Sequence, residues 1–330
     1  MRQIIPRQNK ISRNQLLGFQ PHFPTNHIPV NAPEMLKTIL PYAGNTGFTP
    51  TSSFYRHITH NVTHVDLNEW RLNVHGLVTK SLSLSFDGIL NMQSVEMPCT
   101  LAAITSMPNN LLVGHALWKG ISFKRLLDEV GLPSEAQYAQ FTSVNGYMTY
   151  LPLNLLNEAL LAYEMNGEPL SAEQGYPVRL IVPGVYDYKM PKWLRSIKLV
   201  STPLLGQYES RGWSVDGIVQ TTSAIFTPRM RESVNGKVVF SGMAFAGTRA
   251  ITGIELSIDD GDWMPVPFAP AELGSWTRWQ IDWQAFTPGD YLVKVRATDS
   301  DGFTQPDASN LLIFPNGSSA IHAVVFRVSM

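Results

Sequence analysis

One arginine stands inside an apolar run of the chain. Arg179 follows Tyr176-Pro177-Val178 and precedes Leu180-Ile181-Val182. Because an unpaired buried charge is costly, the guanidinium needs a partner, and phosphate is a good bidentate one. An internal Asp or Glu would serve as well. From the residues alone, an anion-binding arginine and an internally paired arginine are equally open.

Two lysines flank a turn a few residues later. Lys189 and Lys192, with Met190 between them, follow Gly184-Val185-Tyr186-Asp187-Tyr188 and precede Trp193. Such a turn presents ammonium groups and backbone N–H groups to an anion. The alternative is an ordinary basic turn in solvent.

A tyrosine is the candidate catalytic side chain. Tyr147 lies in Asn145-Gly146-Tyr147-Met148, a loop that we expect between a strand and a helix. A phenol in such a loop could donate to a substrate oxygen. Packing of the ring under the turn is an equally open interpretation.

Four histidines lie close together in the sequence, beside Arg56. They are His57, His60, His64 and, in a later strand-like segment, His75. His60 and His64 are four residues apart, which on a helix would place two imidazoles on one face for a metal. Their β-branched neighbours indicate extended chain instead. We therefore interpret this segment as a loop of partly solvated histidines without a metal.

Composition excludes several classes of protein. The formal charge of the 330 residues is −1 and no Lys/Arg cluster appears, so we expect no nucleic-acid binding. Cys99 is the only cysteine, which excludes an intrachain disulfide, a zinc ribbon and an iron–sulfur cluster. The sequence has no apolar run of about 18 residues. The basic N-terminus lacks the apolar core of a signal peptide, so we expect a cytoplasmic protein, although a peripheral subunit of a larger complex would look the same.

These side chains must be positioned by strands and helices, and the sequence pattern predicts an α+β domain over residues 49–202. Residues 1–48, rich in Pro, Asn and Gln, are expected to form an extended arm. Alternation predicts strands, and helical spacing with Gly131 as a C-cap predicts helices. The expected strands are Trp70–Val78, Leu82–Leu84, 139–144, 178–182 and 194–200, and the expected helices are Phe86–Met92, Phe123–Val130 and Leu153–Tyr163.

The pattern changes in residues 203–330. Short β-rich runs alternate with Gly, Pro and Asp turns, which predicts an immunoglobulin-like β-sandwich. The expected strands are Val238–Ala244, Gly253–Ile258, Thr277–Trp283, Gly289–Thr298 and Ile321–Val328.

From about residue 45 to 328 the chain resembles the sulfite-oxidase-like molybdopterin oxidoreductases. The most specific matches are Met165-Asn166-Gly167-Glu168-Pro169 and Lys192-Trp193-Leu194, supported by Ala116-Leu117-Trp118-Lys119-Gly120. The resemblance implies a molybdopterin cofactor, oxygen-atom transfer, and a C-terminal dimerisation domain in a homodimer or a larger redox complex. It implies Tyr147 as the pocket tyrosine. The implied cofactor contacts are Tyr55, Arg56, His57, Thr59, Ala103, Asn145, Gln174, Arg179, Lys189, Met190 and Lys192.

The chain departs from this family at the metal ligand. Ala103 stands where the family has the cysteine whose thiolate holds molybdenum, and a methyl group cannot ligate a metal. Cys99 lies four residues earlier, about 13 Å away on an extended strand, and reaches the metal only if the local register shifts.

Two further departures affect the substrate. Thr105-Ser106-Met107 replaces an Asn-Arg-Arg segment that would bind sulfite, and Gln174 replaces a histidine. We therefore expect a molybdopterin-binding oxidoreductase for a substrate other than sulfite. The alternative is a non-catalytic structural or docking subunit that keeps the fold.

Overall fold

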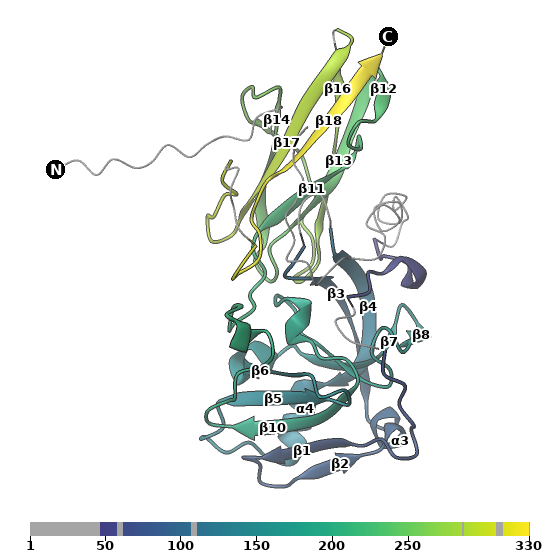
Figure 1. The fold of residues 1–330 in the computed structure, drawn as a ribbon, viewed down its shortest axis with the longest axis vertical. Helices are drawn as coiled ribbons and strands as arrows, with labels where there is room; N and C mark the ends of the chain where they lie inside the picture. Colours follow the sequence, from purple (N-terminus) through teal and green to yellow (C-terminus); the bar gives the residue numbers. More distant parts are fainter. Residues whose placement is uncertain (1–46, 58–61, 107–110, 286, 308–312, 330) are drawn as a thin grey trace, which may run out of the picture. The chain divides into compact units, whose positions relative to one another are not determined.

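The computed structural model describes residues 47–57, 62–106, 111–285, 287–307 and 313–329 (Figure 1). The predicted arm over residues 1–48 lies almost wholly outside the described residues, as do Thr59 and His60. Contacts divide the chain into two compact units. The N-terminal unit comprises Gly44–Ile104 and Leu112–Val219, and the C-terminal unit contains the residues from Gln220 onward.

A five-stranded sheet in the order β2-β1-β10-β5-β6 forms one layer of the N-terminal unit (Figure 1). Strands β1 and β10 are parallel, and the other neighbours are antiparallel. The buried residues of β1, Leu72 and Val74, alternate with half-buried ones, as the sequence predicted for a half-buried strand. The strands are Leu72–Gly76 (β1), Leu82–Leu84 (β2), Tyr138–Ser143 (β5), Met148–Pro152 (β6) and Leu194–Val200 (β10).

A second sheet, in the order β3-β4-β7-β8 with β9 also paired to β7, forms the rest of the unit's β-structure. It is antiparallel throughout. Its strands are Ser94–Ala102 (β3), Val113–Ser122 (β4), Leu160–Met165 (β7), Glu168–Pro169 (β8) and Arg179–Ile181 (β9).

Two predicted helices are confirmed and one is wrong. The α-helices are Phe86–Leu90 (α3) and Phe123–Val130 (α4), and Gly131 caps α4 with a positive φ of 68°. The helix predicted over Leu153–Tyr163 is instead a 3-10 turn, Leu153–Leu156 (η2), followed by strand β7. Pairing of β7 with both β4 and β9 outweighs the helical spacing of its leucines. The described residues are therefore mostly β-structure, whereas the sequence predicted an α+β domain. The remaining short helices are 3-10 turns, at Thr51–Ser53 (η1), Asp187–Lys189 (η3) and Glu209–Arg211 (η4).

The Asn166-Gly167 motif forms the two-residue turn between β7 and β8. Both residues have positive φ, 54° and 81°, as a tight hairpin turn requires. The Asn166 side chain accepts from the Leu117 backbone N–H at 3.0 Å and donates to the Thr49 carbonyl at 2.9 Å. The motif thus ties three separate segments together.

The C-terminal unit contains two sheets, in the orders β11-β13-β16 and β12-β18-β17-β14-β15. The five strands predicted there are all present. Residues of both sheets, such as Phe240 and Trp279 from one and Val293 and Phe326 from the other, share one buried core. The strands are Thr222–Thr227 (β11), Ser233–Asn235 (β12), Lys237–Phe245 (β13), Ile251–Ile258 (β14), Met264–Pro265 (β15), Thr277–Gln284 (β16), Gly289–Asp299 (β17) and His322–Ser329 (β18). Nowhere in the described chain is a helix long and apolar enough to cross a membrane.

Candidate functional site

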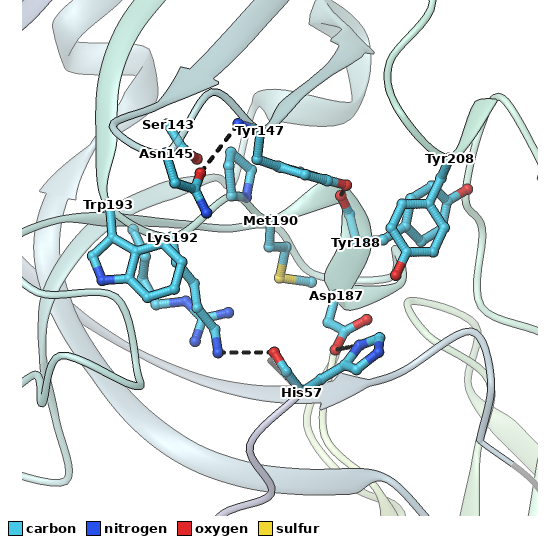
Figure 2. A pocket seen from close by; sticks show the side chains of 12 residues that line it. His57, Ser143, Asn145, Tyr147, Asp187, Tyr188, Met190, Lys192, Trp193 and Tyr208 are labelled. Carbon is cyan, nitrogen blue, oxygen red and sulfur yellow. Dashed lines mark hydrogen bonds and ion pairs between the residues drawn. The ribbon is translucent and has the colours of Figure 1, made fainter. Parts of the chain in front are cut away.

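A pocket with about 530 Å³ of empty space opens in the N-terminal unit (Figure 2). It gathers most of the polar side chains that the sequence singled out, together with several aromatic rings. Its lining residues are His57, Ser143, Asn145, Tyr147, Arg179, Asp187, Tyr188, Met190, Pro191, Lys192, Trp193 and Tyr208. A smaller adjoining cavity is lined by Phe54, Tyr55, His57, Leu101, Gln174, Arg179, Asp187 and Lys192.

Asp187, the first residue of η3, lines both cavities. Its Oδ2 accepts from the Tyr55 hydroxyl at 3.1 Å and lies 3.3 Å from His57 Nδ1 (Figure 2 shows the second contact). Because a carboxylate only accepts, Nδ1 carries the proton in this contact. Oδ1 is buried and has no hydrogen-bond partner among the described residues.

Arg179, the first residue of β9, is 2% exposed. It donates to the backbone and side-chain oxygens of Gln174 at 3.1 and 3.3 Å, and its guanidinium lies 5.2 Å from the Trp118 ring centroid. Among the described residues it has no carboxylate within 4.0 Å, and its Nε has no hydrogen-bond partner. Burial lowers the pKa of Arg179. The alternative of an internally ion-paired arginine is therefore not found in this part of the chain.

Lys192 lines the pocket and contacts the loop of residues 171–177. Its Nζ donates to the backbone carbonyls of Glu173 at 2.7 Å and His57 at 3.2 Å. Gly175, with φ of 108°, allows this approach, because a Cβ there would lie 2.8 Å from Lys192 Cβ. Burial, followed in effect by Arg179, lowers the pKa of Lys192 to about 7.

Lys189 lies away from both cavities. It is fully buried and pairs with Glu209, and it also donates to the Tyr150 carbonyl at 3.0 Å. The hydroxyl of Thr149 donates to the same carboxylate at 2.7 Å. Its neighbour Met190 does line the larger pocket, so the turn at η3 sends its side chains in different directions.

Tyr147 belongs to the turn between β5 and β6, so the expected loop leads into a strand rather than a helix. Its hydroxyl donates to the Tyr188 carbonyl, and Asn145 Oδ1 accepts from its backbone N–H at 3.1 Å. Burial raises the pKa of Tyr147 well above its ordinary value. The ring packs near Tyr208, with the centroids 6.3 Å apart.

Ala103 directly follows β3 and is fully buried, with its N–H bonded to the Leu112 carbonyl. The β3–β4 ladder runs without a register shift from Ser94↔Ile121 to Ala102↔Val113. Cys99 therefore stays on an extended strand in this structure, and burial raises the pKa of its thiol to about 12.

The remaining predicted contacts do not all reach the pocket. Arg56 is exposed, and Thr59 lies outside the described residues. His64 is exposed, while His75 on β1 bonds Ser196 at 3.0 Å, so the described histidines do not gather into one site.

Comparison with known proteins now decides the family. The profile of the oxidoreductase molybdopterin-binding domain matches residues 59–208. The uncharacterized oxidoreductase YuiH of Bacillus subtilis (strain 168) is 33% identical over 154 residues, which are 46% of this chain and 76% of YuiH. This chain belongs to the sulfite-oxidase-like molybdopterin oxidoreductases.

More distant members cover more of the chain. Human mitochondrial sulfite oxidase is 27% identical over 314 residues, 78% of this chain and 57% of that protein. Nitrate reductase [NADH] 1 of Phaseolus vulgaris is 25% identical over 353 residues, 86% of this chain and 40% of the reductase. The sulfane dehydrogenase SoxCD of Paracoccus pantotrophus has the same fold, with a TM-score of 0.73, 22% identity and coverage of 87% of this chain and 85% of that one. The chain therefore spans only part of the sulfite oxidase and the nitrate reductase.

The cofactor of this family is molybdopterin, and the residues present fit its anionic end. Two cationic side chains border the pocket without a carboxylate partner in the described part of the chain, and Arg179 Nε has hydrogen-bonding capacity to spare. A phosphate oxygen would accept a hydrogen bond from this Nε. Position 103 does not fit the metal, because it supplies a methyl group.

The pocket residues that the sequence did not predict include Asp187, Tyr188, Trp193 and Tyr208. Asp187 was visible in the segment before the two lysines, but its partners Tyr55 and His57 lie more than a hundred residues away in sequence. No local spacing connects them.

Proposed function

We propose that the chain is an oxidoreductase that holds molybdopterin through Arg179 and Lys192 and acts on a substrate other than sulfite. The observation that carries the proposal is a pair of largely buried cationic side chains that share one pocket and have no carboxylate within 4.0 Å among the described residues. The charge of Asp187 acts on both, but one carboxylate cannot balance two buried positive charges, whereas a phosphate offers charge-assisted hydrogen bonds to both.

The bound cofactor would supply oxygen-atom transfer, and the chain's own residues would bind and orient. Gln174 holds the Arg179 guanidinium, and the carbonyls of Glu173 and His57 hold the Lys192 ammonium. Tyr147 lines the pocket with a phenol whose raised pKa keeps its proton. Because that proton is donated to the Tyr188 carbonyl, the hydroxyl would offer its oxygen as an acceptor to substrate and would donate only after exchanging that bond. Gln174, Met190 and Asn145 would complete the contacts.

A non-catalytic role is the second candidate, and Ala103 favours it. The position is fully buried and its methyl cannot replace a thiolate ligand. In that case the fold would act as a structural or docking subunit, with the pocket empty or holding a vestigial cofactor.

Assembly and location belong to the same proposal. The two sheets of the C-terminal unit share one core, which supports an immunoglobulin-like sandwich of the dimerisation type. We propose that it mediates a homodimer or docking into a larger redox complex, in the cytoplasm or at a membrane complex.

Cofactor analysis tests the proposal. The chain would be purified from a host that synthesises molybdopterin, denatured and oxidised, and its pterin fluorescence and molybdenum and tungsten content measured. About one pterin per chain is expected, and Lys192→Met should lower retention about tenfold, as loss of a charge-assisted contact predicts. Lys124→Met, at an exposed site on α4, is the matched control.

The outcomes separate the two candidates. Absence of pterin from the unmodified chain overturns the proposed binding and supports an empty docking subunit. Pterin with metal and turnover of an oxygen-atom donor rules out the non-catalytic role.

A further inference from the structure

We propose that Asp187 and the tyrosine wall of the pocket form a subsite for a cationic nitrogen group of the substrate, such as an amidinium or a protonated amine. The inference rests on the proposed function and names the substrate class of the same pocket. The tyrosine wall is defined here as Tyr147, Tyr188 and Tyr208.

The Asp187 carboxylate has a free acceptor. Its side chain is 8% exposed, and Oδ2 already takes the Tyr55 hydroxyl and His57 Nδ1. Oδ1 has no hydrogen-bond partner within the described residues, although it is buried. Buried carboxylate oxygens are normally satisfied, so an unfilled one at a cavity points to a donor brought by a ligand.

The charge of the filled pocket favours a cation. Arg179 and Lys192 line the same cavity, and a bound phosphate ester of charge between about −1.5 and −2 would neutralise them. The Asp187 carboxylate would then be left as a largely buried negative charge beside the substrate space. A substrate with one positive charge compensates it, whereas an oxoanion such as sulfite would add a second negative charge.

The tyrosine wall suits the same group. The rings of Tyr188 and Tyr208 lie 5.0 Å apart with 33° between their planes. The Tyr147 hydroxyl is held by the Tyr188 carbonyl, and the Tyr188 hydroxyl by the Ser214 carbonyl, so the ring positions are fixed. Figure 2 shows the labelled rings on one side of Asp187. Aromatic faces attract cations and enclose planar groups.

A series of three probes of equal size and different charge tests the inference. Benzamidine, benzamide and benzoate would be titrated at pH 7 by calorimetry into the chain without substitutions and loaded with pterin, with quenching of tryptophan fluorescence as a second readout because Trp193 lines the pocket. Benzamidine should bind about tenfold or more tightly than benzoate, with benzamide between them. Equal or tighter binding of benzoate overturns the inference, and this comparison needs no variant.

A substitution locates the effect. Asp187→Asn should weaken benzamidine binding about tenfold and change benzamide binding by less than about threefold, because only the charged partner is lost. Asp128→Asn, the same substitution on exposed α4, should leave both unchanged. Unaltered benzamidine binding by a folded Asp187→Asn chain overturns the proposal.

Pterin content measured in the same preparations separates the two proposals. Retained pterin without benzamidine selectivity defeats the cationic subsite alone. A chain that never holds pterin defeats the proposed cofactor binding, and benzamidine binding that is still weakened by Asp187→Asn in that chain keeps the cationic subsite.

Discussion

The phenol of Tyr55 donates a 3.1 Å hydrogen bond to the carboxylate of Asp187 across 132 residues of sequence. Burial and the nearby carboxylate raise the pKa of Tyr55 well above its ordinary value, so the hydroxyl keeps its proton and remains a donor. This contact holds η3 against the segment that follows η1. It also orients the carboxylate that both cavities share.

Removing this hydroxyl should destabilise the N-terminal unit. Tyr55→Phe takes a donor from a buried carboxylate, which should lower the free energy of unfolding by about 1.5–3 kcal/mol. Tyr138→Phe is the matched control, because the Tyr138 hydroxyl bonds no described residue and the change should stay within about 0.5 kcal/mol. Denaturant unfolding measures both, and equal effects would contradict a specific role for the Tyr55–Asp187 bond.

Anion binding should weaken as pH rises through 7. The lowered pKa of Lys192, about 7 because of burial and then Arg179, leaves the ammonium charged below this pH and increasingly neutral above it. Sulfate keeps its charge over this range, so its affinity should fall about tenfold between pH 6 and 8.5. Calorimetry at several pH values measures the step. Lys192→Met should bind sulfate weakly and lack a step centred near pH 7; a step that survives there would assign it to another group.

The Lys189–Glu209 pair should contribute to stability through its burial. Both side chains are 0% exposed, so Lys189→Met leaves an unpaired carboxylate in the interior and should cost about 3–5 kcal/mol. Breaking the exposed Lys124–Asp128 pair by Lys124→Met should cost no more than about 1 kcal/mol. Adding Glu209→Gln to Lys189→Met should recover part of the loss. A cost below about 1 kcal/mol for Lys189→Met would contradict the buried charge.

Alanine at Gly175 should disturb the pocket, whereas alanine at Gly146 should not. Both glycines have positive φ, 108° and 81°, but only the Gly175 Cβ would meet Lys192, at 2.8 Å. Gly146→Ala should cost about 1 kcal/mol and Gly175→Ala about 3 kcal/mol, because the second adds a steric clash. Sulfate affinity, measured on the same variants, should fall for Gly175→Ala alone.

Cys99 should be unreactive in the folded chain. Its thiol is fully buried, and a pKa of about 12 leaves almost no thiolate at pH 8. An aromatic disulfide reagent should label no thiol in the native chain and one after denaturation, with absorbance as the readout. Rapid native labelling would show that the strand opens enough for Cys99 to reach other groups.

The hydrophobic pattern predicted an element correctly where the element's own residues determine its structure. Phe123, Leu126 and Val130 lie on the buried face of α4, with Ser122 and Gly131 as its caps. Leu153, Leu156 and Leu160 show similar spacing, yet the last of them begins a strand between β4 and β9. Pairing with β4 and β9 makes this segment a strand, and neither partner can be recognised from the sequence of the segment alone.

The site shows the same difference between local and distant information. Arg179 stood out because a charge inside an apolar run needs an explanation, and the structure does place it at a pocket. Lys189 and Lys192 looked equivalent in one turn, but Glu209, twenty residues onward, takes the first lysine and leaves the second. Distant partners therefore determine which residues of a motif remain available for a ligand.

The Asn166-Gly167 turn affects how members of this family are recognised. The side chain of Asn166 forms hydrogen bonds with the backbone of Leu117 and Thr49, and neither residue lines the pocket. The turn would be retained by selection for folding alone, even in a lineage that had lost its chemistry. The turn therefore reports on the architecture of the chain, and the residues around Asp187 and position 103 are the ones that report on its chemistry.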